Sequence, residues 1–210
     1  MAAMRCRYLI PPTNEPNPSC VCGLTCSHTS FVVHALTCNK VRGFNRASRH
    51  KLLKKAFKSV LRKYGFHPDE HEPRFGDDGE GPDISFAFDD NLLLIDVSTV
   101  CPLADSYVHD EDSNPGFLLA KAEQDKITKY GDFAATRNMN FEPAVFNHMG
   151  TPGPVSLALL RKLSRATADP NGFMTHMLMA CGVAISTGNA RMVCAVVGLR
   201  CSLSRFWFLV

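Results

Sequence analysis

The chain has 210 residues, of which 45% are hydrophobic and 20% are charged, so its composition is that of one globular domain with room for a small extra module and excludes a largely disordered chain. The first residues contain no apolar run long enough for a signal peptide, and the apolar tail after Met192 is broken by Arg200 and Arg205; we therefore expect a soluble intracellular protein without a membrane span. The net charge of +3 conceals a segregation, because positions 40–63 hold ten Lys and Arg and no acid, whereas positions 69–112 are acidic.

The N-terminal part combines a Pro- and Asn-containing opening with a group of cysteines. The opening predicts an unstructured arm over 1–19. Nine cysteines without a secretory signal argue against a disulfide framework and favour metal ligation or core packing. The candidate ligands are the clustered Cys20, Cys22, Cys26 and Cys38, and the predicted core cysteines are Cys101, Cys181, Cys194 and Cys201.

The next segment, up to Tyr64, predicts a basic amphipathic helix. Apolar residues from Leu52 to Tyr64 recur at helical spacing, Ser48 is the expected N-cap, and Gly65 is expected to end the helix. Its basic face is either a footprint for nucleic-acid phosphates or an ordinary solvated helix face.

Two strands joined by a tight turn are expected next. Residues 83–88 alternate with Ile84, Phe86 and Phe88 on one face, and the Asp-Asp-Asn run at 89–91 turns the chain into a second strand over 92–100. This second strand is strongly apolar but contains Asp96, and an ionised carboxylate there costs several kcal/mol unless a cation or a proton compensates it.

The remainder predicts a helix at about 117–135, a strand at 142–148, and helices that begin near Pro154, Asn171 and Asn189. In the first of these helices, Lys126 lies within the apolar stripe and Lys129 lies on its flank. Two carboxylates on paired strands, with a lysine on the buried face of the next helix, are what metal-assisted phosphodiester hydrolysis requires. The same pattern also fits a structural aspartate that is paired with a backbone amide or a lysine, and a lysine that snorkels.

Several motifs together resemble one family. They are PD at 82–83, DVS at 96–98 and KITKY at 126–130, supported by RH at 49–50, EP at 72–73, FEPAVFNHMG at 141–150 and ISTGNAR at 185–191. In this order they resemble the restriction-enzyme-like endonuclease domain of site-specific non-LTR retrotransposons, a branch of the PD-(D/E)xK nuclease superfamily in which the lysine has moved to the helix. The resemblance covers most of the chain from position 20 to about 200.

The resemblance implies an α/β fold with a PD-(D/E)xK restriction-endonuclease-like core, in which a small mixed sheet is flanked by helices. It divides the chain into the arm 1–19, a zinc-knuckle segment 20–45, the nuclease core 46–150 and a C-terminal helical extension 151–210. Asp83 and Asp96 would bind Mg²⁺ or Mn²⁺, with the carbonyl of Val97 as an optional third ligand. Lys126 would be the catalytic lysine, with Lys129 as the alternative.

Three further positions follow from the same resemblance. Glu72 is a weaker candidate for an additional acidic ligand, and Tyr130 is expected to belong to the core rather than to the chemistry. The family commonly has Arg or Lys immediately before the Pro-Asp pair, whereas this chain has Gly81, which has no side chain to make the phosphate contact that the resemblance implies at that position.

In the same family a Cys-Cys-His-Cys zinc knuckle precedes the nuclease. The resemblance assigns Zn²⁺ to Cys20, Cys22, His34 and Cys38, and Cys26 in place of Cys20 remains open because the single residue between Cys20 and Cys22 is tight for zinc. The basic segment would then follow DNA phosphates. The expected DNA contacts are Arg42, Arg46, Arg49, Lys51, Lys55 and Lys58.

The implied activity is Mg²⁺-dependent hydrolysis of a DNA phosphodiester to leave a 3′-hydroxyl that primes reverse transcription. DNA would be the partner, together with a reverse transcriptase and its RNA in a complete element, and a nuclear location is expected. The alternatives are a catalytically inactive DNA-binding remnant of such a domain and a zinc-dependent protein-interaction domain.

Overall fold

The computed structural model describes residues 19–25, 27–38, 40, 45–74, 81–102 and 115–196. The expected arm therefore lies outside the described residues except for Ser19, and Cys26 and Arg42 lie outside them as well. The elements in chain order are α2 (His28–Thr37), α3 (Arg46–Lys63), β1 (Ile84–Phe88), β2 (Asn91–Val100), α5 (Pro115–Ala135), β3 (Met139–Asn147), α6 (Pro154–Arg165) and α7 (Pro170–Val196).

The described strands form one small mixed sheet in the order β1-β2-β3, which confirms the expected α/β class. β1 and β2 are antiparallel, with Ile84 opposite Ile95, and β2 and β3 are parallel. Asp89 and Asp90 join β1 to β2 with φ values of 51° and 60°, the left-handed conformations that a two-residue hairpin turn of type I′ requires. α5 makes the crossover between the two parallel strands, as a parallel connection needs.

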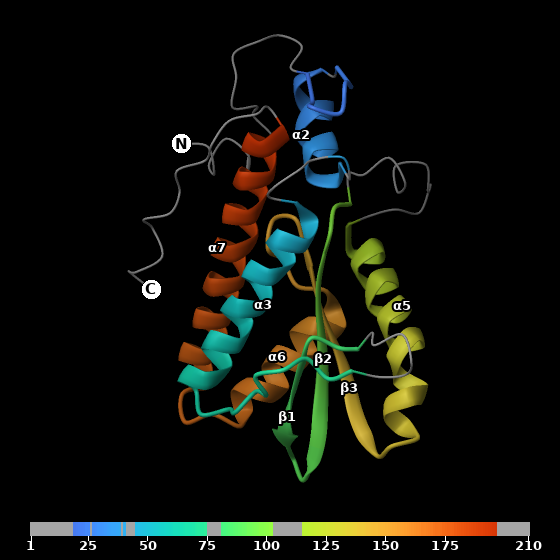
Figure 1. Ribbon diagram of the computed structural model, residues 1–210. Helices are drawn as coiled ribbons and strands as arrows, with labels where there is room; N and C mark the ends of the chain where they lie inside the picture. Colours follow the sequence, from blue (N-terminus) through green and yellow to red (C-terminus); the bar gives the residue numbers. More distant parts are fainter. Residues whose placement is uncertain are drawn as a thin grey trace.

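Helices cover both faces of the sheet. In Figure 1, α5 stands on one side of the strands and α3 and α7 stand on the other, with α6 behind the sheet. The main core lies between the sheet and α3, α6 and α7, and includes Phe57, Phe86, Phe146, Leu160 and Phe173. The helices after position 150 thus share one core with the sheet.

The ends of α3 show one expectation confirmed and one wrong. Gly65 follows the helix with a φ of 87°, so it ends the helix as expected. The N-cap is Asn45 rather than Ser48, because the Asn45 side chain accepts a hydrogen bond from the Ser48 amide at 3.1 Å. Both residue types favour this position, and the helix simply begins three residues earlier.

α7 is one continuous helix of 27 residues, so the expected helix start near Asn189 is wrong. Asn189 lies inside the helix, where its buried side chain is used for tertiary hydrogen bonds rather than for capping. By length and composition α7 could also cross a membrane, but 56% of its apolar window is buried inside the domain. In this domain it is a core helix.

The front segment packs against the far end of α7. Phe31, Val32 and Leu36 of α2 form a second apolar cluster with Val193 and Val196 of α7. The Val21 amide also donates to the Val196 carbonyl at 2.9 Å. The short cysteine-containing segment is therefore anchored to the domain, although it is too small for a core of its own.

Candidate functional site

The two predicted site aspartates lie at the open end of the β1–β2 pairing. Ile84, the first residue of β1, is paired with Ile95, so Asp83 immediately precedes β1 and Asp96 follows Ile95 within β2. The Asp83 amide donates to the Ile95 carbonyl at 3.0 Å, and the Val97 amide donates to Asp83 Oδ2 at 2.8 Å. Both residues are buried, with 7% of Asp83 and 5% of Asp96 exposed. Two buried carboxylates thus lie near each other, with the charge of Asp83 acting on Asp96.

Each aspartate has a cationic neighbour from a different helix. Lys126 Nζ on α5 lies 2.9 Å from Asp96 Oδ2. On the other side, His50 Nε2 on α3 lies 2.8 Å from Asp83 Oδ1, and Lys54 Nζ lies 3.6 Å from the same oxygen. The buried charge at Asp96, which the sequence left unexplained, is therefore accompanied by the predicted lysine.

These neighbours shift the two pKa values in opposite directions. Burial alone would raise the pKa of Asp83, but the hydrogen bond and charge of His50, the Val97 amide and Lys54 outweigh it, so the pKa lies below its ordinary value. For Asp96, burial outweighs the contribution of Lys126, and the charge of Asp83 adds to the effect, so the pKa is raised. Asp83 is the more firmly ionised of the pair.

The structure separates the two candidate lysines. Lys126 is the one that contacts Asp96. Lys129 Nζ lies 5.0 Å from the centre of the Tyr130 ring, and that ring is buried and packs against Phe141 with 5.3 Å between centroids. Tyr130 therefore has the surroundings of a core residue, as expected.

Glu72 lies near the site, but its contact is with Lys54 rather than with another carboxylate. Its side chain forms an ion pair with Lys54 Nζ and is 55% exposed. The segment that carries it passes against Gly81, where a Cβ atom would overlap the carbonyl oxygen of Pro73. Position 81 therefore has no space for the larger side chain that the family commonly carries.

Sequence reasoning missed His50 and Lys54 as members of the site. His50, Lys54 and Lys58 follow one another at intervals of four residues, so they form one stripe along α3. His50 and Lys54 reach Asp83, and Lys58 donates to the carbonyls of Asp69 and Glu70 at 2.5 and 3.3 Å. Lys51 and Lys55 have the same spacing but are exposed, so the spacing alone does not identify the stripe that faces the site.

Two expected DNA contacts are wrong because their side chains are buried. Arg49 is 3% exposed and donates to Asn189 Oδ1 at 2.8 Å, while Asn189 Nδ2 donates to the His148 carbonyl at 2.7 Å. Lys58 is 8% exposed and burial lowers its pKa. Neither can reach a phosphate on the surface.

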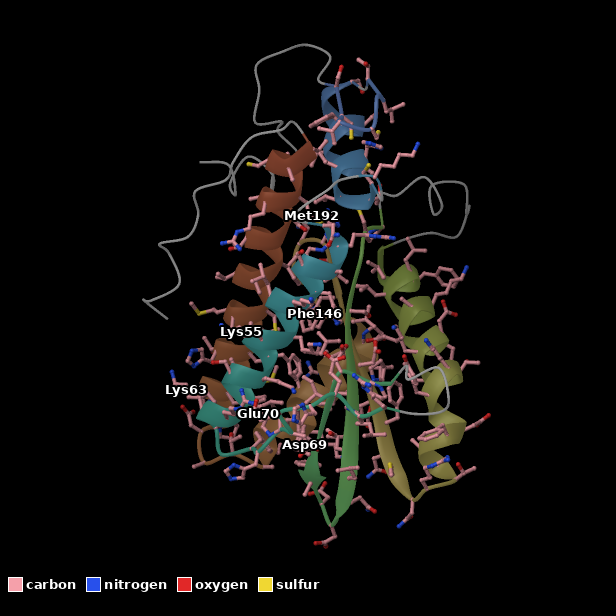
Figure 2. All side chains as sticks on the ribbon, viewed as in Figure 1. Lys55, Lys63, Asp69, Glu70, Phe146 and Met192 are labelled. Carbon is pink, nitrogen blue, oxygen red and sulfur yellow. The ribbon has the colours of Figure 1, made fainter. Side chains whose placement is uncertain are left out.

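The other described members of that set remain available. Arg46, Lys51 and Lys55 are exposed on α3. Figure 2 shows Lys55 and Lys63 on α3, with Asp69 and Glu70 on the segment beside its C-terminal half. The acidic segment therefore neutralises part of the basic helix and leaves its outer side positive.

Glu123, which sequence reasoning also missed, fixes the helix that carries Lys126. Its fully buried carboxylate accepts from the Val155 amide at 3.1 Å, the Ser156 amide at 2.7 Å and the Ser156 hydroxyl at 2.6 Å. These amides belong to the first turn of α6, where backbone donors have no partner within the helix. A Cβ atom at Gly153 would collide with this carboxylate. Glu123 is thus a structural anchor one turn away from Lys126.

The four predicted zinc ligands do come together. One ligand atom from each of Cys20, Cys22, His34 and Cys38 lies within 4.8 Å of all the others. The Sγ atoms of Cys20 and Cys38 are 3.8 Å apart, and Cys22 Sγ lies 3.3 Å from His34 Nε2. Zn–S bonds of about 2.3 Å in a tetrahedron set sulfur atoms about 3.8 Å apart, so the set fits a four-coordinate ion. This cluster could hold a metal ion and is consistent with zinc.

Of the two alternative ligands, Cys20 and Cys26, the structure describes Cys20 alone. Cys20 is buried in the cluster, whereas Cys26 lies outside the described residues. Burial raises the pKa of the Cys20 thiol to about 12, so a bound cation is what would keep it as a thiolate at neutral pH. The set with Cys20 is complete among the described residues, and the alternative with Cys26 stays a prediction.

Neither the models of known protein families nor the curated proteins contain a match to this chain.

Proposed function

We propose that this chain is a metal-dependent DNA endonuclease with a PD-(D/E)xK-type core, derived from a non-LTR retrotransposon. The observation that carries the proposal is the arrangement of Asp83, Asp96 and Lys126. Two buried carboxylates lie near each other at the open end of the β1–β2 pairing, and the lysine of a separate helix lies 2.9 Å from one of them. A purely structural ion pair would need only one of these carboxylates.

The residues fit a hard divalent cation. Asp96 Oδ2 is buried, and no described group makes a well-directed hydrogen bond to it, although Lys126 forms an ion pair with it. Carboxylate oxygens of this kind are the donors that Mg²⁺ and Mn²⁺ prefer, so Asp83 and Asp96 would hold the ion. When bound, such an ion polarises the phosphoryl group and lowers the pKa of a coordinated water.

The surrounding residues have separable roles in this proposal. The Val97 amide and His50 hold Asp83 in its ionised form and in one orientation. Asp96 holds the ammonium group of Lys126 at the site, where its charge would offset the negative charge that develops on the phosphate. Arg46, Lys51 and Lys55 would contact phosphates and supply salt-dependent, largely sequence-independent affinity.

The biological setting of the proposal rests on the family resemblance. Cleavage would leave a 3′-hydroxyl from which the reverse transcriptase of a complete element, acting with its RNA in the nucleus, starts synthesis. The Cys20–Cys38 module would bind zinc and stabilise the front of the domain, because a segment of this size folds around its metal rather than around a core.

The test is nicking of supercoiled plasmid by the purified chain with Mg²⁺ or Mn²⁺, next to the variant Asp96→Ala. Conversion of supercoiled to open-circular DNA by the parent, and none by the variant, is the expected result. A folded parent that binds DNA and leaves the plasmid intact would instead identify the chain as an inactive DNA-binding remnant.

A further inference from the structure

Lys54 occupies a different position from the other lysines of α3. Only 15% of its side chain is exposed, and its Nζ lies between a buried and an exposed carboxylate. It lies 3.6 Å from Asp83 Oδ1, beyond hydrogen-bond distance, and forms its direct ion pair with Glu72. Its charge is therefore held at the edge of the site rather than inside it.

Asp83 does not depend on Lys54 for its hydrogen bonds. Oδ1 has His50 at 2.8 Å, and Oδ2 accepts from the Val97 amide at 2.8 Å. Lys54 thus adds positive charge next to a carboxylate whose two oxygens already have partners. A lysine that served only to satisfy Asp83 would lie closer to it.

The partner that Lys54 does contact is easily exchanged. Glu72 lies on the segment beside α3 and 55% of its side chain is exposed. The pair is open to solvent on the Glu72 side, where ion pairs contribute about 0–1 kcal/mol, so a DNA phosphate, supported by the charges of its neighbours along the strand, can replace the carboxylate. Lys126 approaches Asp96 from α5, whereas Lys54 approaches Asp83 from α3, so the two lysines reach the site from separate helices.

We infer that Lys54 binds a phosphate of the DNA substrate at the entrance to the Asp83–Asp96 site, and that Glu72 occupies Lys54 until DNA displaces it. This inference rests on the proposed nuclease function and deepens it, because it gives the acid at position 72 the role of a competing anion instead of a metal ligand. The phosphate-binding cation of this site then comes from α3, since Gly81 carries no side chain and has no space for one.

The test measures DNA binding rather than cleavage. The full chain, purified in zinc-containing buffer, is titrated into a fluorescent DNA duplex without added Mg²⁺ or Mn²⁺, and anisotropy is recorded over a range of salt. Lys54→Gln is expected to weaken binding several-fold and to lower the slope of log Kd against log salt by about 1, as expected for one lost phosphate contact. Lys54→Arg keeps the charge and should retain most of the affinity.

Glu72→Gln is expected to tighten binding several-fold, and this gain should disappear in the Lys54→Gln background. The matched control is Glu70→Gln, which removes the same charge from the same segment but pairs with Arg62 at 2.8 Å instead of Lys54. Equal effects of Glu72→Gln and Glu70→Gln, or independent addition of the Lys54 and Glu72 effects, would overturn the inference.

Binding and nicking separate the two proposals. If the variants show the expected effects on binding but the parent does not nick plasmid, the role of Lys54 stands and the proposed nuclease function is refuted. If the parent nicks plasmid and Lys54→Gln binds DNA as tightly as the parent does, only the inference about Lys54 is refuted. If the parent binds no DNA, both proposals are refuted. Unchanged far-ultraviolet circular dichroism and thermal midpoint of each variant show that folding is intact.

Discussion

The backbone amide of Val97 donates to Asp83 Oδ2 at 2.8 Å, so the carboxylate at the start of one site strand is oriented by the neighbour of Asp96 on the other. This bond, together with the strand register, holds the two aspartates in one arrangement. Their environments still differ, because Asp83 has donors for both of its oxygens and Asp96 has mainly the ion pair with Lys126. Each aspartate should therefore respond differently to neutralisation.

Asp83→Asn should lower the free energy of unfolding at pH 7. The pKa of Asp83 is depressed in the folded state, so its ionised form contributes stability above the unfolded pKa, and this stability is lost as pH falls through the folded pKa. A hydrogen bond to a charged group contributes about 1.5–3 kcal/mol, which sets the expected loss. Urea unfolding at pH 7 and at acidic pH measures it, and the difference from the parent should shrink in acid.

Asp96→Asn, in contrast to Asp83→Asn, should not lower the free energy of unfolding at pH 7. The pKa of Asp96 is raised because burial outweighs Lys126, so the folded state loses stability as pH rises through the window between the ordinary and the folded pKa. The amide removes this cost at pH 7, and Lys126, which is partly exposed, can turn its charge to water. The same urea series should show a variant at least as stable as the parent, while plasmid nicking is lost. A strongly destabilised Asp96→Asn would mean that the ion pair is structural.

Lys126→Ala should abolish plasmid nicking and leave DNA affinity nearly unchanged. Its ammonium lies 2.9 Å from Asp96, where it would offset charge on the reacting phosphate instead of holding DNA from outside. Lys129→Ala is the matched control, because it removes the same charge from an exposed position on the same helix. Full activity of Lys126→Ala combined with loss in Lys129→Ala would transfer the role to Lys129.

The sheet and most of the helices could be predicted because their signals are local. Alternating Ile84, Phe86 and Phe88, followed by two aspartates that tolerate a left-handed turn, predict the hairpin that carries Asp83 and Asp96. Helical periodicity likewise places Lys126 on the inner side of α5. The Cys-Cys-His-Cys set was proposed from family resemblance, and the folded chain brings its four ligand atoms together.

Which polar side chains are buried, and which partners they have, could not be predicted, because this depends on contacts between residues distant in the sequence that no local pattern encodes. Arg49 and Lys58 belong to a helix that carries many cations, and only the packing of α7 and of the segment at 67–74 determines which of them are buried. Asn189 resembles a helix cap in the sequence, yet its partners are Arg49 and His148, more than 40 residues away. The spacing of Glu123 from Leu119 and Tyr130 places it on the buried face of α5, but its partners are two amides of α6 more than 30 residues away, which this spacing does not predict.

Glu123→Ala should destabilise the domain by about 2–4 kcal/mol, since it leaves buried donors at the start of α6 without their charged acceptor. Gly153→Ala should also destabilise, because its Cβ collides with the Glu123 carboxylate. The two changes share one cause, so the double variant should lose less than the sum of the single losses in urea unfolding.

The control for this pair is Gly131→Ala, also on α5. Its added Cβ would meet Ile127 Cγ2 at 3.7 Å, an ordinary contact, so the change should stabilise the domain by about 0.5–1 kcal/mol through helix propensity. Additive effects of Glu123→Ala and Gly153→Ala would show that Gly153 is required for another reason.

Cys38→Ser should remove zinc from the protein and release the front segment from α7. Cys38 Sγ is 3.8 Å from Cys20 Sγ within the four-ligand set, and a serine hydroxyl is a much weaker zinc ligand than a thiolate. Metal content by atomic emission should fall from one zinc per chain towards none, and the Val21 amide, which donates to Val196, should lose its protection from hydrogen exchange. Cys101→Ala is the control, because Cys101 is buried in the same apolar cluster but lies outside the ligand set. This variant should keep its zinc at a modest cost in stability. Unchanged zinc in Cys38→Ser would show that these four residues do not form the metal site.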